Sequence, residues 1–156
     1  MKMRWLRIAA VLGLLVQVAG CADDEKTEVL SNVDDGVAVQ SGGVTFALGD
    51  SRASIEAIEG VRLYELGALG TRFELPDSHV AGFLDATGVA VLTVYDDFAG
   101  ITKGEVGLGS PLSAVVETYG EGVSDPFIQA RSYPELGVGF IFDPSDLVIG
   151  IRVFAH

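Results

Sequence analysis

Two stretches of the chain, 48–60 and 108–120, share a pattern of residues at a spacing of sixty positions. Each begins with Leu-Gly, continues with small polar residues and a short apolar segment, and ends at a glycine. Repetition at such a spacing predicts repeated structural units, and units this short must pack together to bury their apolar sides. The chain is therefore expected to contain two similar units that share one core.

Each stretch has the residue types that begin and end a helix. In the second, Ser110 suits the N-cap, Pro111 the first helical position, and Gly120 the left-handed conformation after the last turn. In the first, Asp50 or Ser51 is the expected cap. Apolar residues fall on one side of each predicted helix, as in a helix packed on a core. They are Ile55 and Ile58 in the first helix, and Leu112, Val115, Val116 and Tyr119 in the second.

Strands are predicted after each helix. The stretches 71–83 and 140–151 each turn at a polar cluster that contains proline, as hairpins do, and 89–95 is another strongly apolar strand. Around the second turn apolar residues alternate, the pattern of strands with one buried face. They are Val138, Phe140 and Phe142 before the turn, and Leu147, Ile149, Ile151 and Val153 after it. We therefore predict an α+β fold: two short helix-plus-antiparallel-strand repeats, at about 44–95 and 104–156, sharing one sheet and core.

The segment 1–20 has the three parts of an export signal. It begins with three cationic residues, continues with an apolar run over 8–18, and ends in small residues. The run is shorter than the roughly 20 residues that a membrane-spanning helix needs. We therefore predict a signal peptide over 1–20.

The end of this segment, Val18-Ala19-Gly20-Cys21, resembles the lipobox of bacterial lipoproteins. The resemblance implies that the chain is cut before Cys21, that its thiol receives a diacylglycerol, and that the new amine is acylated, with palmitate as a typical chain. Because the next residue is alanine rather than aspartate, it also implies an outer-membrane protein that faces the periplasm. The alternative is an unmodified thiol beside an ordinary cleavage site.

Composition divides the rest of the chain into a tether and a domain. Residues 21–43 are rich in Asp, Glu, Ser, Asn and Gly, which predicts an acidic flexible tether, and 44–156 has the size of one domain. The whole chain has 10 basic and 22 acidic residues, a net charge of −12. The basic residues of the predicted mature chain are scattered singly, whereas binding to phosphates requires clusters of them. We therefore predict no nucleic-acid partner, and membrane contact through the lipid anchor alone.

The lipobox, the acidic tether and the unit of a helix followed by antiparallel strands together resemble the small envelope lipoproteins of the SmpA/OmlA type. The doubled unit is similar to the tandem arrangement of β-lactamase inhibitory protein. The likeness depends on the Leu-Gly pairs at 48–49 and 108–109, each opening a helix that ends at Gly60 or Gly120. Those families usually have two helices in each unit, whereas one is predicted here. The resemblance implies a noncatalytic protein that presents a surface to another protein.

No catalytic, cofactor or metal motif is predicted. The two histidines, His79 and His156, lie in no metal-binding spacing, and an acylated Cys21 leaves no thiol. Serines at the helix starts, Ser51, Ser110 and Ser113, are explained by capping. The glycines at 104, 107 and 109 lack the Lys-Ser/Thr ending of a phosphate loop.

Two acidic turns leave one alternative open. Asp96 and Asp97, and Asp143 and Asp146, supply oxygen atoms that suit calcium, although neither pair fits the twelve-residue calcium loop. The sequence thus predicts a lipid-anchored envelope lipoprotein, not an enzyme and without cofactor, whose periplasmic domain binds an envelope protein. The alternative is a small-ligand or cation-binding envelope protein that uses the acidic turns.

Overall fold

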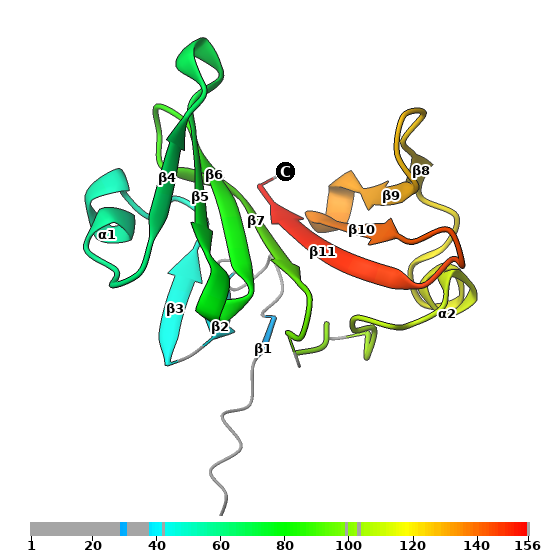
Figure 1. Cartoon of the computed structure of the whole chain (residues 1–156). Coiled ribbons are helices and arrows are strands. Elements are labelled where there is room, and N and C mark those ends of the chain that lie inside the picture. Colours follow the sequence, from blue (N-terminus) through cyan, green and yellow to red (C-terminus); the bar gives the residue numbers. More distant parts are fainter. Residues whose placement is uncertain (1–28, 31–37, 42, 99, 103, 156) are drawn as a thin grey trace, which may run out of the picture.

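The computed structural model describes residues 29–30, 38–41, 43–98, 100–102 and 104–155, and an eight-stranded antiparallel sheet dominates it (Figure 1). The strand order is β4-β5-β6-β7-β11-β10-β9-β8, so two four-stranded meanders meet where β7 pairs with β11. The strands are β4 (Arg62–Glu65), β5 (Thr71–Leu75), β6 (Val80–Leu84), β7 (Val89–Tyr95), β8 (Val123–Ser124), β9 (Ala130–Tyr133), β10 (Val138–Phe142) and β11 (Val148–Phe154).

A smaller antiparallel sheet has the order β1-β2-β3. Its strands are β1 (Val29–Leu30), β2 (Ala38–Ser41) and β3 (Val44–Ala47). Val39 of β2 and Phe46 of β3 are fully buried and belong to the main core. Because β1 and β2 lie within the predicted tether, the packed domain includes residues from before position 44.

The predicted α+β class, with two helix-plus-strand repeats, is wrong. In the described ranges the α-helices are α1 (Arg52–Glu56) and α2 (Leu112–Tyr119). There are also three 3₁₀ turns in these ranges, η2 (Gly67–Leu69), η3 (Pro76–Ser78) and η4 (Pro134–Leu136). Helices of five and eight residues are too short to form a layer of their own. Helices of this length depend on tertiary packing for their stability. Neither described helix has the length and apolar character that crossing a membrane requires. The fold is therefore dominated by its sheet.

The helix starts follow the sequence only in part. The Ser51 hydroxyl caps α1 by accepting a hydrogen bond from the Ser54 backbone N–H at 3.2 Å, one of the two caps predicted. The predicted Ser110 cap is wrong, because Ser110 accepts from the Gly107 N–H and Pro111 occupies the N-cap position of α2. Helix α1 also ends at Glu56, before the predicted stop at 60.

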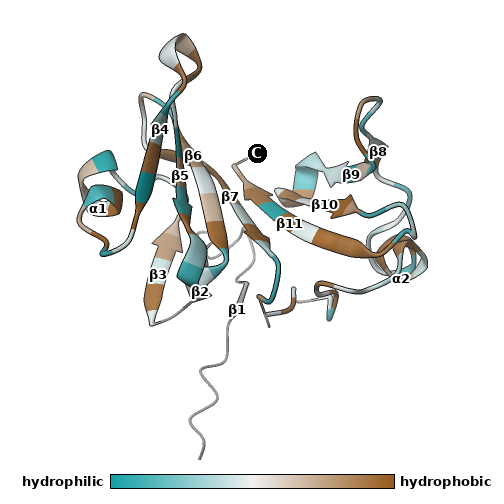
Figure 2. Cartoon of the chain, in the orientation of Figure 1, coloured by the Kyte–Doolittle hydropathy of each residue, from teal (hydrophilic) through white to brown (hydrophobic). Residues whose placement is uncertain are grey.

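Alternation along the strands buries one face of the large sheet (Figure 2). In β5, Phe73 and Leu75 are buried while Arg72 is exposed, and in β11 Ile151 and Val153 are buried on either side of the half-buried Arg152. The buried face packs against α1, α2, the small sheet and the loop after β7. The residues that these segments contribute to the core are Val39, Phe46, Ile55, Phe98, Val106 and Val115.

The two meanders correspond in a different way from the sequence prediction. The 3₁₀ turns η3 and η4 each begin with proline and are each followed by a left-handed residue, His79 (φ 52°) and Gly137 (φ 60°). The counterpart of the β5–β6 hairpin is thus β9–β10, so the predicted match of 71–83 with 140–151 is wrong by one hairpin. The turns at Pro134 and Pro144 both contain proline, so composition alone did not show which of them corresponds to the turn at Pro76.

A β-bulge also shifts the predicted buried face of β11. The register between β10 and β11 changes between Ile141 and Phe142, so that Phe142 lies opposite Val148. As a result Val148 is buried and Ile149, predicted to face the core, is half exposed. An extra residue at a bulge moves the following side chains to the other face.

Candidate binding groove

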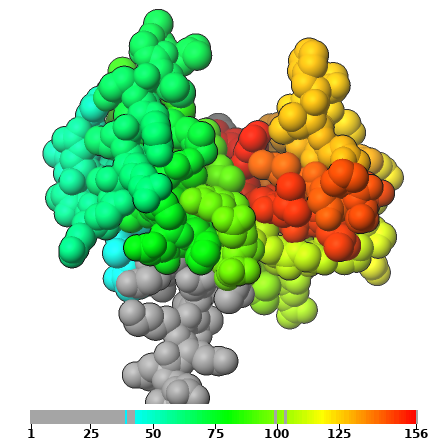
Figure 3. Space-filling model, viewed as in Figure 1, coloured from blue at the N-terminus to red at the C-terminus, as the bar shows by residue number. Residues whose placement is uncertain are grey.

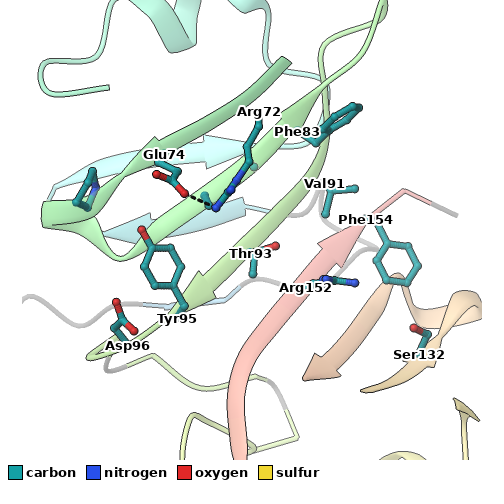
Figure 4. A pocket seen from close by; sticks show the side chains of 13 residues that line it. Arg72, Glu74, Phe83, Val91, Thr93, Tyr95, Asp96, Ser132, Arg152 and Phe154 are labelled. Atoms are coloured by element: carbon teal, nitrogen blue, oxygen red, sulfur yellow. Dashed lines mark hydrogen bonds and ion pairs between the residues drawn. The ribbon is translucent and has the colours of Figure 1, made fainter. Parts of the chain in front are cut away.

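The exposed face of the large sheet carries a groove with a volume of about 830 Å³. It crosses the junction of the two meanders, where β7 pairs with β11 (Figure 4). Strands β5, β6, β7, β9 and β11 supply nearly all of its lining. The lining residues are Arg72, Glu74, Pro76, Ala81, Gly82, Phe83, Val91, Thr93, Tyr95, Asp96, Ser132, Arg152 and Phe154.

Strand register brings these side chains together. Arg72 lies opposite Phe83, so both project from the same face of the sheet. At the central pair of strands, Thr93 lies opposite Arg152, and Val91 lies opposite Phe154. Residues that are about sixty positions apart in the chain thus become neighbours in one groove.

The end of the groove formed by β5 and β7 is polar and internally paired. Arg72 forms an ion pair with Glu74, and Tyr95 lies beside them (Figure 4). Burial raises the pKa of the Tyr95 hydroxyl, and the negative charges of Glu74 and Asp96 raise it further, while Arg72 opposes them. Tyr95 therefore keeps its proton at neutral pH and offers a hydrogen-bond donor to the groove.

The end formed by β9 and β11 has small residues around one arginine. Arg152 is flanked along its strand by Gly150 and Phe154, and the residue opposite it on β10 is Gly139. Within the described part of the chain, Arg152 makes no ion pair or hydrogen bond. Its guanidinium is half-buried and remains available to a ligand.

Two exposed apolar hairpin tips project on the same side of the molecule (Figure 1). The tip between β4 and β5 carries Leu69, which is 72% exposed, and the tip between β8 and β9 carries Phe127, which is 93% exposed. The surface is hollowed between them (Figure 3). The Phe127 backbone N–H donates to the Asp125 carboxylate at 2.8 Å, so the second tip has a defined turn. Leu66, near Leu69 in the chain, and Ile128, next to Phe127, are each 43% exposed as well. Exposed apolar side chains that cluster in this way are typical of interaction sites.

The predicted lipid-attachment residue Cys21 and the lipobox residues Val18, Ala19 and Gly20 lie outside the described residues. His156 also lies outside them. His79 occupies the left-handed position after η3, with its ring centroid 6.4 Å from that of Tyr95.

The acidic turn between β10 and β11 has a structural role. The Asp143 carboxylate accepts hydrogen bonds from the backbone N–H groups of Ser145 and Leu147, at 2.8 and 2.9 Å, and thereby closes the β10–β11 turn. Asp96 and Asp143 line one shallow hollow of about 380 Å³. Among the described residues, no group of three or more His, Cys, Asp or Glu side chains could hold a metal ion.

The groove was not predicted from the sequence. Arg72 and Arg152 are among the singly scattered basic residues, and nothing in the sequence around them places them on one surface. The available indication was polar residues at alternate positions within apolar strands, at 72 and 74 in β5 and at 152 in β11. That pattern indicates which face of a strand is exposed, but not which strands are neighbours.

The chain matches no protein-family model, and no curated protein or solved structure shows significant similarity to it. Its function must therefore be argued from the groove and the hairpin tips themselves.

Proposed function

We propose that this chain is a lipid-anchored envelope protein whose domain binds another protein, without catalysis, through the groove and the two hairpin tips. The observation that carries the proposal is the combination of Phe83, Tyr95, Phe154 and Arg152 in one open groove. Aromatic residues and arginine are enriched at the centres of protein interfaces and carry much of their binding free energy.

The position of the groove agrees with such a role. The helices, the small sheet and the core lie on the opposite face of the large sheet, so a partner can occupy the groove without disturbing the core. The strands that form its floor are hydrogen-bonded on both sides. A rigid floor lowers the entropic cost of binding, because few side chains and little backbone need to be ordered.

Site-specific photocrosslinking in cells that express the full chain tests this surface. A photoreactive phenylalanine analogue at Phe83, in the groove, should give a discrete protein adduct on irradiation. The matched control is the same analogue at Glu117, an exposed residue of α2 on the other side of the sheet. Equal adducts from both positions, or none from Phe83, would contradict the proposal.

The anchor needs a separate test. A Cys21→Ala variant should incorporate no labelled palmitate and should accumulate as uncleaved precursor, because lipoprotein processing requires the modified thiol. A mature, soluble product from this variant would refute the lipobox prediction and leave the groove proposal intact.

The alternative of cation binding by the acidic turns is tested by thermal denaturation with and without calcium. A ligand that binds only the folded state raises the melting temperature, and the rise grows with the logarithm of the ligand concentration once that concentration exceeds Kd. A calcium-dependent rise that is lost in an Asp143→Asn variant, together with no groove adduct, would favour this alternative.

A further inference from the structure

The two ends of the groove differ in their charge balance. At the β5 end, the guanidinium of Arg72 is already neutralised by Glu74, and Asp96 adds a second carboxylate. At the β11 end, Arg152 has no carboxylate beside it in the described part of the chain (Figure 4). The groove therefore has one half-buried positive charge without a counter-charge.

This lack of a counter-charge is unusual in so acidic a chain. The net charge is −12, and three of the four other described arginines form ion pairs. Arg52 contacts Glu56 and Glu65, Arg131 contacts Glu121, and Arg72 contacts Glu74. Arg62 forms no ion pair among the described residues, but it lies opposite Glu74 in strand register. A partly buried charge loses hydration, which costs free energy until an opposite charge approaches.

Small and apolar residues surround Arg152. Gly139 and Gly150 add no side chain beside it, and the side chains next to these glycines are those of Ile141, Ser132 and Phe154. Phe154, on the same strand, offers an apolar surface to the groove. Thr93, opposite on β7, adds a hydroxyl. A guanidinium recognises a carboxylate through two parallel hydrogen bonds, so this site fits one carboxylate flanked by apolar groups.

We propose that the groove binds an acidic segment of another protein, in which one Asp or Glu carboxylate pairs with Arg152 and flanking apolar side chains pack on Phe83 and Phe154. Leu69 and Phe127, at the hairpin tips, contact the apolar surface on either side of that segment. This inference rests on the proposed function, because it names the chemistry of the partner at the same surface. Two whole chains of net charge −12 repel each other more strongly than one such chain repels a segment that carries a single carboxylate, so a second copy of the chain fits less well.

Selection from a library of displayed random dodecapeptides tests the chemistry directly, with the purified full chain as bait. Wild-type protein should enrich peptides with one Asp or Glu next to large apolar residues. The charge-reversed variant Arg152→Glu should instead enrich Lys or Arg at that position. A Glu117→Gln variant, altered on the other side of the sheet, is the matched control and should enrich the same peptides as wild type.

Affinity measurements on one enriched acidic peptide give the magnitude. Arg152→Gln should weaken its binding roughly tenfold to a hundredfold, since removing one member of a partly buried charge pair leaves the other unpaired. Replacing the carboxylate of the peptide by its amide should weaken binding to wild type equally and change little in Arg152→Gln. Unchanged melting temperatures show that the variants are folded.

Three results would overturn the inference. Peptides that bind the groove without any carboxylate, and that lose affinity on Phe83→Ser but not on Arg152→Gln, would refute the acidic partner and keep the proposed function. Absence of any peptide sensitive to Phe83→Ser or Arg152→Gln would count against both. Binding to phosphatidylglycerol vesicles that is lost in Arg152→Gln, or a dimer in solution that Arg152→Gln dissociates, would assign the site to a lipid headgroup or to a second copy.

Discussion

The two meanders of the sheet share a pattern of backbone hydrogen bonds and differ in their side chains. In the first, the Gly49 N–H donates to the Val89 carbonyl at 2.8 Å, and in the second the Gly109 N–H donates to the Val148 carbonyl at 2.7 Å. Both meanders also have a bulge where their last two strands pair. The correspondence extends from the start of each helix to the last strand, so backbone hydrogen bonding determines the shared framework.

The core packing of the two meanders is arranged in opposite ways. In the first, Phe73 of β5 lies over Gly82 of β6, and in the second Phe140 of β10 lies opposite Arg131 of β9. Thus the large aromatic residue lies on the second strand of the first meander and on the third strand of the second meander. In each meander only one of these two paired positions carries a large aromatic side chain, because a close-packed core has no room for two.

The attachment of the helices differs in the same way. Arg52 of α1 reaches the sheet, where it contacts Glu65 and Thr71, whereas Arg131 reaches from the sheet to Glu121 beyond α2. On the exposed face, the first meander contributes the ion pair of Arg72 with Glu74, and the second contributes Arg152, which forms no ion pair within the described part of the chain. The comparison teaches that one backbone pattern can be kept while the side chains of its two copies take separate tasks.

The largest expected effect is at the core of the second meander. Phe140 is 1% exposed and its ring centroid lies 5.3 Å from that of Tyr119. A Phe140→Ala variant should lose about 3–5 kcal/mol of unfolding free energy, because a large cavity opens among aromatic rings. Urea denaturation followed by circular dichroism measures this. The control Phe127→Ala, at an exposed tip, should stay within about 0.5 kcal/mol of wild type, and an equal loss in both would contradict the packing described.

The next effect is at the position where the meanders differ most in size. A Cβ atom at residue 82 would lie 2.3 Å from the Phe73 ring, so Gly82→Ala should lower the unfolding free energy by about 1–3 kcal/mol through overpacking. At Gly139 the nearest atom would be 3.4 Å away, and Gly139→Ala should cost much less. Adding Phe73→Leu to Gly82→Ala should cost less than the sum of the two single variants. Strict additivity in the same urea series would count against the contact.

A smaller effect is expected at the left-handed residue after each 3₁₀ turn. Gly137 has a φ of 60°, where a side chain is strained, so Gly137→Ala should cost about 1–2 kcal/mol. His79 already has a side chain at φ 52°, and His79→Gly should be neutral or slightly stabilising in thermal denaturation. If His79→Gly lowers stability as much as Gly137→Ala, the contact of His79 with Tyr95 outweighs the backbone strain.

The smallest effect concerns the contact between α1 and the sheet, and it depends on pH. The hydrogen bond from Arg52, followed by that from Thr71, lowers the pKa of the exposed Glu65 carboxylate. Because the folded-state pKa is the lower one, this stabilisation is fully present above the unfolded value of about 4.5 and is lost as the pH falls through the folded value. In a Glu65→Gln variant, the melting temperature should therefore change less between about pH 5 and pH 3 than it does in the wild type. Arg52→Gln should remove the same pH-dependent stabilisation. If the double variant loses the sum of two separate contributions, the two side chains are not coupled and the prediction is contradicted.

Local pattern predicted several elements correctly. The strand at 89–95 is confirmed as β7, Ser51 caps α1 as one of the two predicted candidates, and the alternation of Val138, Phe140 and Phe142 is confirmed in β10. These features depend on neighbours within a few residues, so periodicity and capping chemistry are sufficient to predict them. The amphipathic pattern of the two short helices predicted an α+β fold, but strands make up a much larger share of the described residues.

The sequence by itself determined which segments alternate, where proline and glycine turn the chain, and that the first 21 residues resemble a lipoprotein signal. The tertiary structure decided that β7 pairs with β11, that the bulge in β11 exposes Ile149, and that Arg152 lies in a groove with Phe83. The physical reason is that strand pairing is a long-range choice, made by burial of whole faces. No local pattern specifies it, and the groove exists only once that choice is made.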